Sequence, residues 1–181
     1  MKINVALVHQ LVAAQFPQWA DLPIKPIAVL DGKIDTNAAT AVWETALQAT
    51  WNGSPVWFHG DVTAGNLLVK DGQLSTVIDF GCSGVGDPAC DLTIAWTLLS
   101  GESREAFCSA LPVDGATWVR GSGWALWKGL ITLAEYIHTN PLKAAEAQHV
   151  INEVLADHKR YVEVDRYAAI THHPTLWEVE R

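Results

Sequence analysis

The amino-acid sequence predicts a mainly α-helical protein of the α+β class that contains one small β-hairpin. Two observations support this fold class. Apolar residues recur at helical spacing on both sides of a central segment, which indicates amphipathic helices. Within that segment, from Val56 to Phe80, the apolar runs are short, and Asp71-Gly72 separates two of them. A chain of 181 residues with 49% hydrophobic composition is long enough to bury one sizeable core.

The N-terminal region predicts one helix followed by an extended connector. Apolar residues from Asn4 to Phe16 have helical spacing, and Asn4 is a suitable N-cap. Three prolines between residues 16 and 26 disfavour helix at the residues before them. We therefore expect residues 1–26 to form a helix and a proline-rich connector, and residues 27–181 to form the main body of a chain that is compact overall.

The main body is expected to begin with a helix over Thr36–Trp51, closed by Asn52-Gly53. Short strands are expected at Val56–Phe58, Asn66–Val69 and Leu74–Phe80, with the last two joined as a hairpin. The Asp-Gly pair supports this hairpin because a type I′ turn requires positive φ at both central residues. The remaining helices are expected at residues 88–100, 103–111, 117–138 and 141–162.

Charge and cysteine content exclude several classes of function. The net charge is −8, which repels a phosphate backbone, so we expect no nucleic-acid partner. An acidic protein attracts cationic small molecules, although acidity for solubility alone is the more common explanation. No run of 18 uncharged apolar residues occurs, so we expect no membrane association. The three cysteines form neither a disulfide framework nor a zinc motif, which favours a reducing cytoplasm.

Three polar residues of the central segment have the types and order that phosphoryl transfer requires. Asp61 and Asn66 lie five residues apart in a loop, and Asp79 follows the expected hairpin. Phosphoryl transfer needs a carboxylate to accept the proton of the attacking hydroxyl, together with oxygen ligands for Mg²⁺. Because a hairpin that starts at Asn66 returns its second strand beside the loop, we expect Asp79 to face Asn66 across the metal.

His59-Gly60-Asp61 with Asn66, and Asp79-Phe80-Gly81, resemble the catalytic loop and metal-binding element of the aminoglycoside phosphotransferase family. The resemblance covers about residues 27–138 and includes the segment from Gly86 to Leu92. It implies a protein-kinase-like C-terminal lobe, with ATP and Mg²⁺ as cofactors. It also implies Asp61 as the catalytic base, Asn66 and Asp79 as metal ligands, and His59 and Asp91 as residues that brace the loop. It identifies no nucleotide-binding residue.

Each of these residues also has a purely structural interpretation, which for Asn66 is the cap of a strand and for Asp79 a buried carboxylate in a turn. Asp61 is a candidate for an Asx turn, and Asp91 for a first-turn helix acid that complements the helix dipole. His59 is more typical of a hydrogen-bonded structural histidine than of an acid or base. Asp79 lies between Ile78 and Phe80, and burial of an unpaired carboxylate is costly, which favours a metal there.

Two other segments are interpreted as structural. The glycine-rich stretch from residue 81 to residue 86 has the order G-x-x-G-x-G and no surrounding βαβ unit, so we expect a flexible loop and no dinucleotide site. Trp118, Trp124 and Trp127 lie within one expected helix. Core packing is the favoured role for all three.

No glycine precedes Gly32, and no strand of the V-A-I-K type precedes His59. We therefore expect the N-terminal lobe that clamps the nucleotide to be missing, and ATP-dependent phosphorylation of a small hydroxylated acceptor to be impaired in this chain alone. A non-catalytic binding or regulatory module derived from a kinase is the alternative. A metallophosphoesterase ranks last because its further His ligands are missing. A homodimer that covers apolar surface is also an expectation.

Overall fold

The computed structural model describes residues 30 and 32–163. By its contacts the chain divides into two units, residues 1–34 and 35–181, and the helices and strands from Thr36 onward belong to the second unit. The helix expected at Asn4–Phe16 and the connector to Pro26 lie outside the described residues. The division expected after residue 26 therefore stays a prediction.

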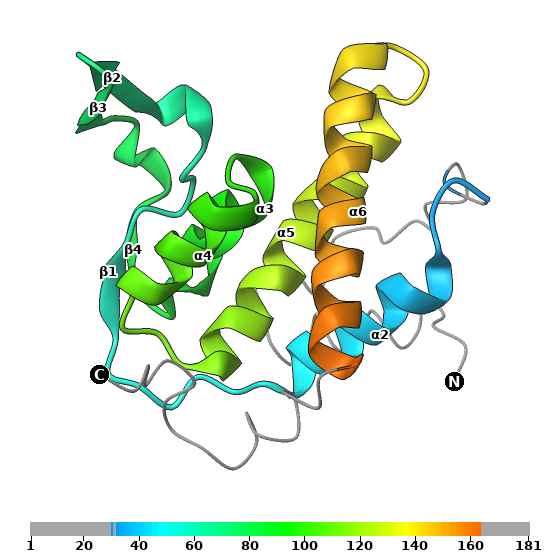
Figure 1. Cartoon of the computed structure of the whole chain (residues 1–181), viewed down its shortest axis with the longest axis horizontal. Coiled ribbons are helices and arrows are strands. Elements are labelled where there is room, and N and C mark those ends of the chain that lie inside the picture. The colour runs from blue at the N-terminus through cyan, green and yellow to red at the C-terminus, as the bar shows by residue number, and fades with distance from the viewer. Residues whose placement is uncertain (1–29, 31, 164–181) are drawn as a thin grey trace. The chain divides into compact units, whose positions relative to one another are not determined.

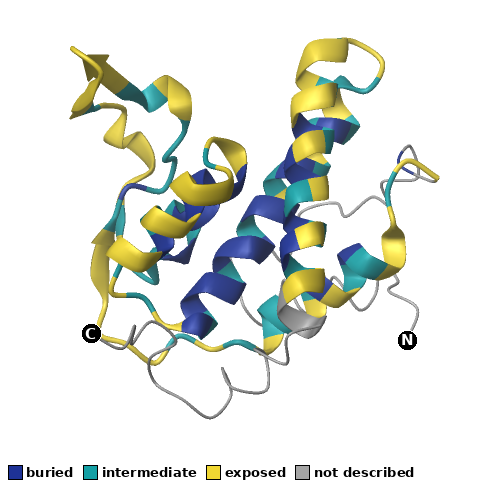
Figure 2. Cartoon of the chain, viewed as in Figure 1, coloured by how far each residue is buried: buried dark blue, intermediate teal, exposed yellow. Residues whose placement is uncertain are grey.

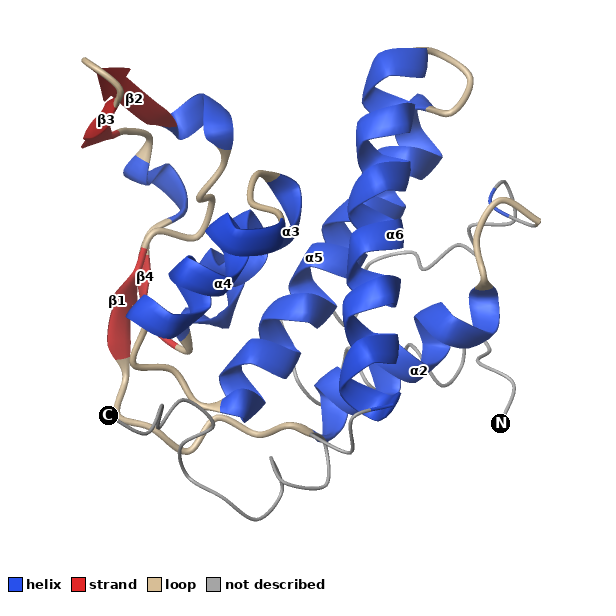
Figure 3. Ribbon diagram, in the orientation of Figure 1, coloured by secondary structure: helices blue, strands red, loops and turns tan. Residues whose placement is uncertain are grey.

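The second unit is mostly helical and carries two small antiparallel sheets, so the α+β class is confirmed (Figure 3). In chain order the helices and strands are α2 (Thr36–Gln48), β1 (Val56–Phe58), β2 (Leu67–Lys70), β3 (Gln73–Val77), β4 (Gly84–Gly86), α3 (Ile94–Thr97), α4 (Gly101–Ala110), α5 (Gly115–Tyr136) and α6 (Pro141–Glu163). Short 3₁₀ helices occupy Ala64–Asn66 (η3), Phe80–Cys82 (η4) and Pro88–Thr93 (η5). No helix among the described residues has the length and apolar character that crossing a membrane requires.

The predicted hairpin is confirmed. Strands β2 and β3 pair antiparallel from Leu67 opposite Val77 to Lys70 opposite Gln73. Asp71 and Gly72 have φ values of 52° and 77°, the positive angles that a type I′ turn requires. The dipeptide in the sequence therefore determines this turn locally.

The glycine-rich stretch was wrongly expected to be a flexible loop. Residues Phe80–Cys82 form η4, and β4 follows it and pairs with β1, with Trp57 opposite Val85. Phe58 lies over Gly84, where an added Cβ would come within 2.7 Å of the phenylalanine ring. The pairing joins segments far apart in the chain, and the glycines hide any alternation, so local patterns did not reveal it.

Three other expected elements differ from the structure. The strand expected to run to Phe80 ends at Val77, because Asp79 adopts a left-handed backbone conformation that leaves the sheet. The helix expected over residues 88–100 is mainly η5, followed by the single turn of α3. The helix expected over residues 36–51 begins at Thr36 but ends at Gln48. The two longest helices begin and end within two residues of the expected positions.

The core lies between the long helices. Figure 1 shows α5 and α6 side by side, with α2 crossing near their lower ends, and Figure 2 shows buried residues concentrated along α5. The largest fully buried side chains come from four different helices: Val42, Trp96, Thr117, Leu126, Ile151 and Val154. Full burial of an aliphatic side chain contributes about 1.5–3 kcal/mol, so this shared core is the main source of stability.

The three tryptophans of α5 have different environments. Trp118 is buried and packs against Trp96 with ring centroids 4.6 Å apart, as expected for a core residue. Trp127 is 43% exposed, so core packing was the wrong prediction for it. Trp124 is half-buried and contacts Trp127 edge to face at 5.6 Å. The exposed part of this pair lies next to Lys128 in the chain.

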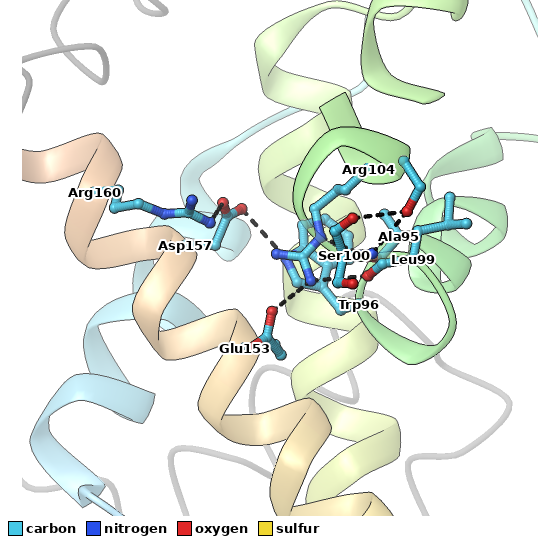
Figure 4. A network of polar contacts seen from close by, with 9 residues as sticks. Ala95, Trp96, Leu99, Ser100, Arg104, Glu153, Asp157 and Arg160 are labelled. Carbon is cyan, nitrogen blue, oxygen red and sulfur yellow. Dashed lines mark hydrogen bonds and ion pairs between the residues drawn. The ribbon is translucent and has the colours of Figure 1, made fainter. Parts of the chain in front are cut away.

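A buried arginine joins α3, α4 and α6 (Figure 4). Arg104 is 5% exposed, and its Nε donates to the carbonyl of Ala95 at 2.7 Å. Its Nη2 donates to the carbonyl of Leu99 at 3.0 Å and to Glu153 Oε2 at 2.6 Å. A buried guanidinium is tolerated when its donors are satisfied in this way. The side chain therefore links the three helices where they meet.

Asp157 of α6 lies in the same region and is 7% exposed. It accepts a hydrogen bond from Trp96 Nε1 at 3.3 Å and forms an ion pair with Arg160 at 3.0 Å. Burial raises the pKa of this carboxyl above its ordinary value of 3.8, and the positive charges of Arg160 and Arg104 oppose the rise. Ionisation of Asp157 is therefore less favourable in the folded protein than in the unfolded chain.

The variant Asp157→Asn should change the pH dependence of stability. Because the folded-state pKa is raised, the cost of ionising Asp157 in the folded protein is absent below the ordinary pKa of 3.8 and grows as pH rises through the folded-state pKa. The wild type should therefore gain stability relative to Asp157→Asn when the pH falls from neutral toward 3.8, as measured by urea unfolding at several pH values. The exposed Glu135→Gln variant is the control for loss of one carboxylate, and parallel pH curves for wild type and Asp157→Asn would contradict the prediction.

Candidate active site

The backbone of the loop from His59 to Asn66 is held by one carboxylate. Asp91, in η5, accepts hydrogen bonds from the backbone amides of His59 and Gly60, each at 2.7 Å, one on each oxygen. The two residues are 32 and 31 positions away from Asp91 in the chain. A carboxylate that accepts from two adjacent amides orients both peptide units, so the start of the loop is fixed relative to η5.

His59 connects this loop to the end of the hairpin. The side chain is 8% exposed, its Nε2 lies 2.9 Å from the carbonyl oxygen of Ile78, and its Nδ1 accepts from the Asp61 amide at 3.2 Å. The carbonyl can only accept and the amide can only donate, so this network assigns the proton to Nε2. The ring also packs against Phe80 with centroids 4.6 Å apart. These contacts hold the residues on both sides of Asp79 close to the loop.

Asp61 and Asn66 are in direct contact. Asn66 Nδ2 donates to the backbone carbonyl of Asp61 at 2.9 Å and to its carboxylate Oδ2 at 3.3 Å. Both side chains are part-buried. With its nitrogen committed to Asp61, the amide of Asn66 retains its oxygen as a free acceptor or metal ligand.

Asp79 is the residue directly after Ile78, whose backbone binds the loop. The amide of Ile78 donates to the carbonyl of Asn66 at 2.9 Å, so both backbone groups of Ile78 bind the loop. Asp79 itself has φ 64° and ψ 63°, a left-handed conformation that is uncommon outside glycine. Such a conformation persists where the surroundings impose it, and it is often found at functional sites.

Asp79 is exposed, whereas the sequence predicted a buried carboxylate. Ile78 and Phe80 are also exposed, so the predicted cost of burying the charge of Asp79 does not arise. No hydrogen bond or ion pair from another described residue reaches its carboxylate. Its availability for a cation therefore rests on its backbone conformation and its position beside Asn66.

One basic residue of α5, Lys128, reaches this region, and a second, Arg120, binds at the start of η5; neither was expected from the sequence. Lys128 Nζ lies 2.6 Å from Asp61 Oδ1. Arg120 binds both oxygens of Asp87, at 2.7 and 3.1 Å, and lies over the Trp51 ring. They are the only basic residues in α5, and a basic residue within an otherwise apolar helix was the signal available.

The oxygen atoms of this site fit magnesium. Among residues 30 and 32–163, no group of three His, Cys, Asp or Glu side chains could hold a metal ion. Magnesium, however, is commonly bound by one or two carboxylates together with phosphate oxygens of the substrate. The free amide oxygen of Asn66 and the unpartnered carboxylate of Asp79 are hard donors of the required kind. The site assignments of these residues stay predictions.

A comparison with protein-family models matches residues 8–129 to the one described as the phosphotransferase enzyme family. The chain belongs to this family. A search of curated proteins and a search of solved structures each gave no match. The matched region of this phosphotransferase-family chain includes the loop from His59, Asp79, Asp91 and, at its end, Lys128.

Membership supports the expected transferase and kinase-like classification and disfavours a phosphoesterase. Within this family member, the contacts above bring Asp61 and Asn66 together and place Asp79 one residue from a backbone group that binds Asn66.

Gly60 is the position in the loop where a side chain is least compatible with the structure. Its φ is 85°, and an added Cβ would lie 2.2 Å from the carbonyl oxygen of Cys82. Gly60→Ala should therefore lower the free energy of unfolding by about 1–3 kcal/mol. Chemical denaturation measures this, with Gly65→Ala in the same loop as control, because the nearest atom to its Cβ lies 4.0 Å away. Equal loss of stability in the two variants would contradict the explanation.

The three free thiols should differ strongly in reactivity. Burial and the charges of Asp91 and Asp87 raise the pKa of Cys90 to about 12, and burial with the charge of Asp157 raises that of Cys108 to about 12. Cys82 is exposed. Because the thiolate is the nucleophile, iodoacetamide at mildly alkaline pH should alkylate Cys82 first, as measured by peptide mass spectrometry. Alkylation of Cys90 at the same rate in the folded protein would show that its thiol is not shielded.

Proposed function

We propose that the protein is an ATP-dependent O-phosphotransferase that phosphorylates a hydroxyl group of a small molecule. The observation that carries this proposal is the convergence of Asp61, Asn66 and the segment before Asp79 within a chain of a phosphotransferase family. Phosphoryl transfer depends on positioning and electrostatics, and this site supplies a base and oxygen ligands on a loop that other residues hold rigidly.

In the proposed reaction, the acceptor hydroxyl donates a hydrogen bond to the carboxylate of Asp61. Its oxygen forms a bond to the γ-phosphorus of ATP while the bond from that phosphorus to the bridging oxygen breaks. The hydroxyl proton passes to Asp61 and ADP leaves. Asn66 contributes by holding Asp61 Oδ2 at 3.3 Å, so the carboxylate is oriented before the acceptor arrives.

Asn66 and Asp79 would hold the magnesium ion. When bound, the ion neutralises negative charge on the phosphate oxygens and aligns them for transfer. His59 and Asp91 act indirectly, since they hold the peptide groups on either side of these ligands. The acceptor is proposed to be a hydroxylated small molecule, and a cationic acceptor is compatible with the net charge of −8.

The 181-residue chain by itself is proposed to bind ATP weakly. Residues 1–58 contain no glycine-rich loop, and each charge-assisted contact to phosphate that such a lobe supplies is worth about 1.5–3 kcal/mol. The same observation favours a second candidate function, that of a non-catalytic binding or regulatory module. Calorimetry with Mg²⁺ and ATP gives the affinity, and from it the ATP concentration that saturates the chain. Release of ADP at that concentration, with a hydroxylated acceptor present, separates the two functions, because a module without chemistry would release none.

The variant Asp61→Asn should lower ATP-dependent phosphorylation by about 10²–10⁴-fold, because the amide cannot accept the proton of the attacking hydroxyl. Release of ADP, measured with a panel of hydroxylated acceptors that includes aminoglycosides, gives the rate. Asp71→Asn is the matched control: it makes the same chemical change in the hairpin turn, where Asn also tolerates the φ of 52°. A rate in Asp61→Asn equal to that of the wild type would show that Asp61 is not the base.

A further inference from the structure

Lys128 is the residue of the site whose presence the mechanism above does not explain. It lies in α5, and its ammonium is 2.6 Å from Asp61 Oδ1, with both side chains 38% exposed. Ion pairs exposed to this degree contribute little to stability. The neighbouring residues Ala125, Leu126 and Gly129 are buried and account for the packing of this part of α5. A structural role alone therefore gives a weak reason for a lysine here.

The position of the ammonium is defined by the base that it contacts. An attacking hydroxyl must lie within hydrogen-bond distance of the Asp61 carboxylate. Asn66 Nδ2 is next to Oδ2, and Lys128 Nζ is next to Oδ1. The ammonium and the attacking hydroxyl would therefore contact the same carboxylate. The transferred phosphoryl group must approach that hydroxyl, so it must also come close to the ammonium.

The charges around the site also favour a role for Lys128 in binding phosphate. Asp61 and Asp79 are both carboxylates, and two negative charges oppose the approach of a polyanionic phosphate donor. Among the described residues, the arginines are bound to carboxylates elsewhere: Arg104 to Glu153, Arg120 to Asp87 and Arg160 to Asp157. Lys128 is the cation that this part of the chain brings to Asp61. Its flexible stem allows it to move from one oxygen to another, as a lysine that binds phosphate as a point charge can.

We infer that Lys128 is a further catalytic residue, a cation that binds the transferred phosphoryl group from the α5 side of the site. The inference rests on the proposed function. Without nucleotide the ammonium is paired with Asp61 and neutralises the base. With the donor bound it contacts the γ-phosphoryl oxygens, so that positive charge lies where negative charge is transferred. The helix thereby supplies a phosphate contact that does not come from an N-terminal lobe.

The test uses the full chain and three probes, Mg²⁺ with ATP, Mg²⁺ with ADP, and inorganic tripolyphosphate, with affinities measured by calorimetry. Loss of one charge-assisted contact in Lys128→Met should weaken ATP binding by about tenfold or more, and ADP binding by less than about twofold. Lys128→Arg should restore most of the preference for ATP, because it keeps the charge. The control Lys143→Met, at the start of α6, removes the same charge elsewhere and should leave all three affinities unchanged.

The results separate this inference from the proposed function. Equal weakening of ATP and ADP in Lys128→Met, or no change in either, would overturn the role of Lys128 while Asp61-dependent turnover still supports the phosphotransferase. Binding of tripolyphosphate that depends on Lys128, with no binding of either nucleotide, would support the phosphate contact and remove ATP as donor. If the wild type binds none of the three probes, the inference is wrong.

Discussion

The site depends on the two hydrogen bonds that Asp91 accepts from the amides of His59 and Gly60. These amides are consecutive and converge on one side chain, and Gly60 must adopt a φ of 85° to present its group. A buried amide without a partner costs about 1–3 kcal/mol, so the loop conformation is stable only with an acceptor at this point. Everything that follows in the loop, including Asp61 and Asn66, takes its position from this start.

The carboxylate of Asp91 is itself held by the helical layer. It belongs to η5, which packs on α5, and Asp87, the N-cap of η5, accepts hydrogen bonds from Nε and Nη2 of Arg120. The long helix α5 thus supports the loop indirectly, because η5 packs on it and carries Asp91. It also reaches the site directly through Lys128. The backbone of a buried helix is held more precisely than that of a loop, and α5 supplies that rigidity at position 128.

Charged groups in this protein have two distinct uses. Arg104 and Asp157 lie in the interior, where desolvation is costly. Arg104 is satisfied by groups of and after α3 and by Glu153 of α6, and Asp157 is bound by Trp96 of α3 and by Arg160 of its own helix. Asp61, Asp79 and Lys128 are reached by solvent, and only Asp61 and Lys128 are paired with each other. The first group stabilises one arrangement of helices. The second group keeps its charges accessible, which the proposed site for a polyanionic ligand and a divalent cation requires.

Some features of the fold and site were determined by short-range sequence. Asp71-Gly72 specifies its turn because few residues adopt two consecutive positive φ angles, and periodic apolar residues define α5 and α6. The motifs around Asp61 and Asp79 were also visible, since their chemistry depends on residue type and spacing. Family membership agrees with what these motifs indicate.

Other features depend on contacts that cross the chain. The pairing of β1 with β4, the exposure of Asp79 and Trp127, and the contact of Lys128 with Asp61 across 67 positions were decided only by tertiary structure. Local patterns report which side of an element is apolar, but not which other element will cover it. Hydrogen bonds and ion pairs between distant residues form only after packing has brought their elements together, because packing supplies most of the free energy that orders them.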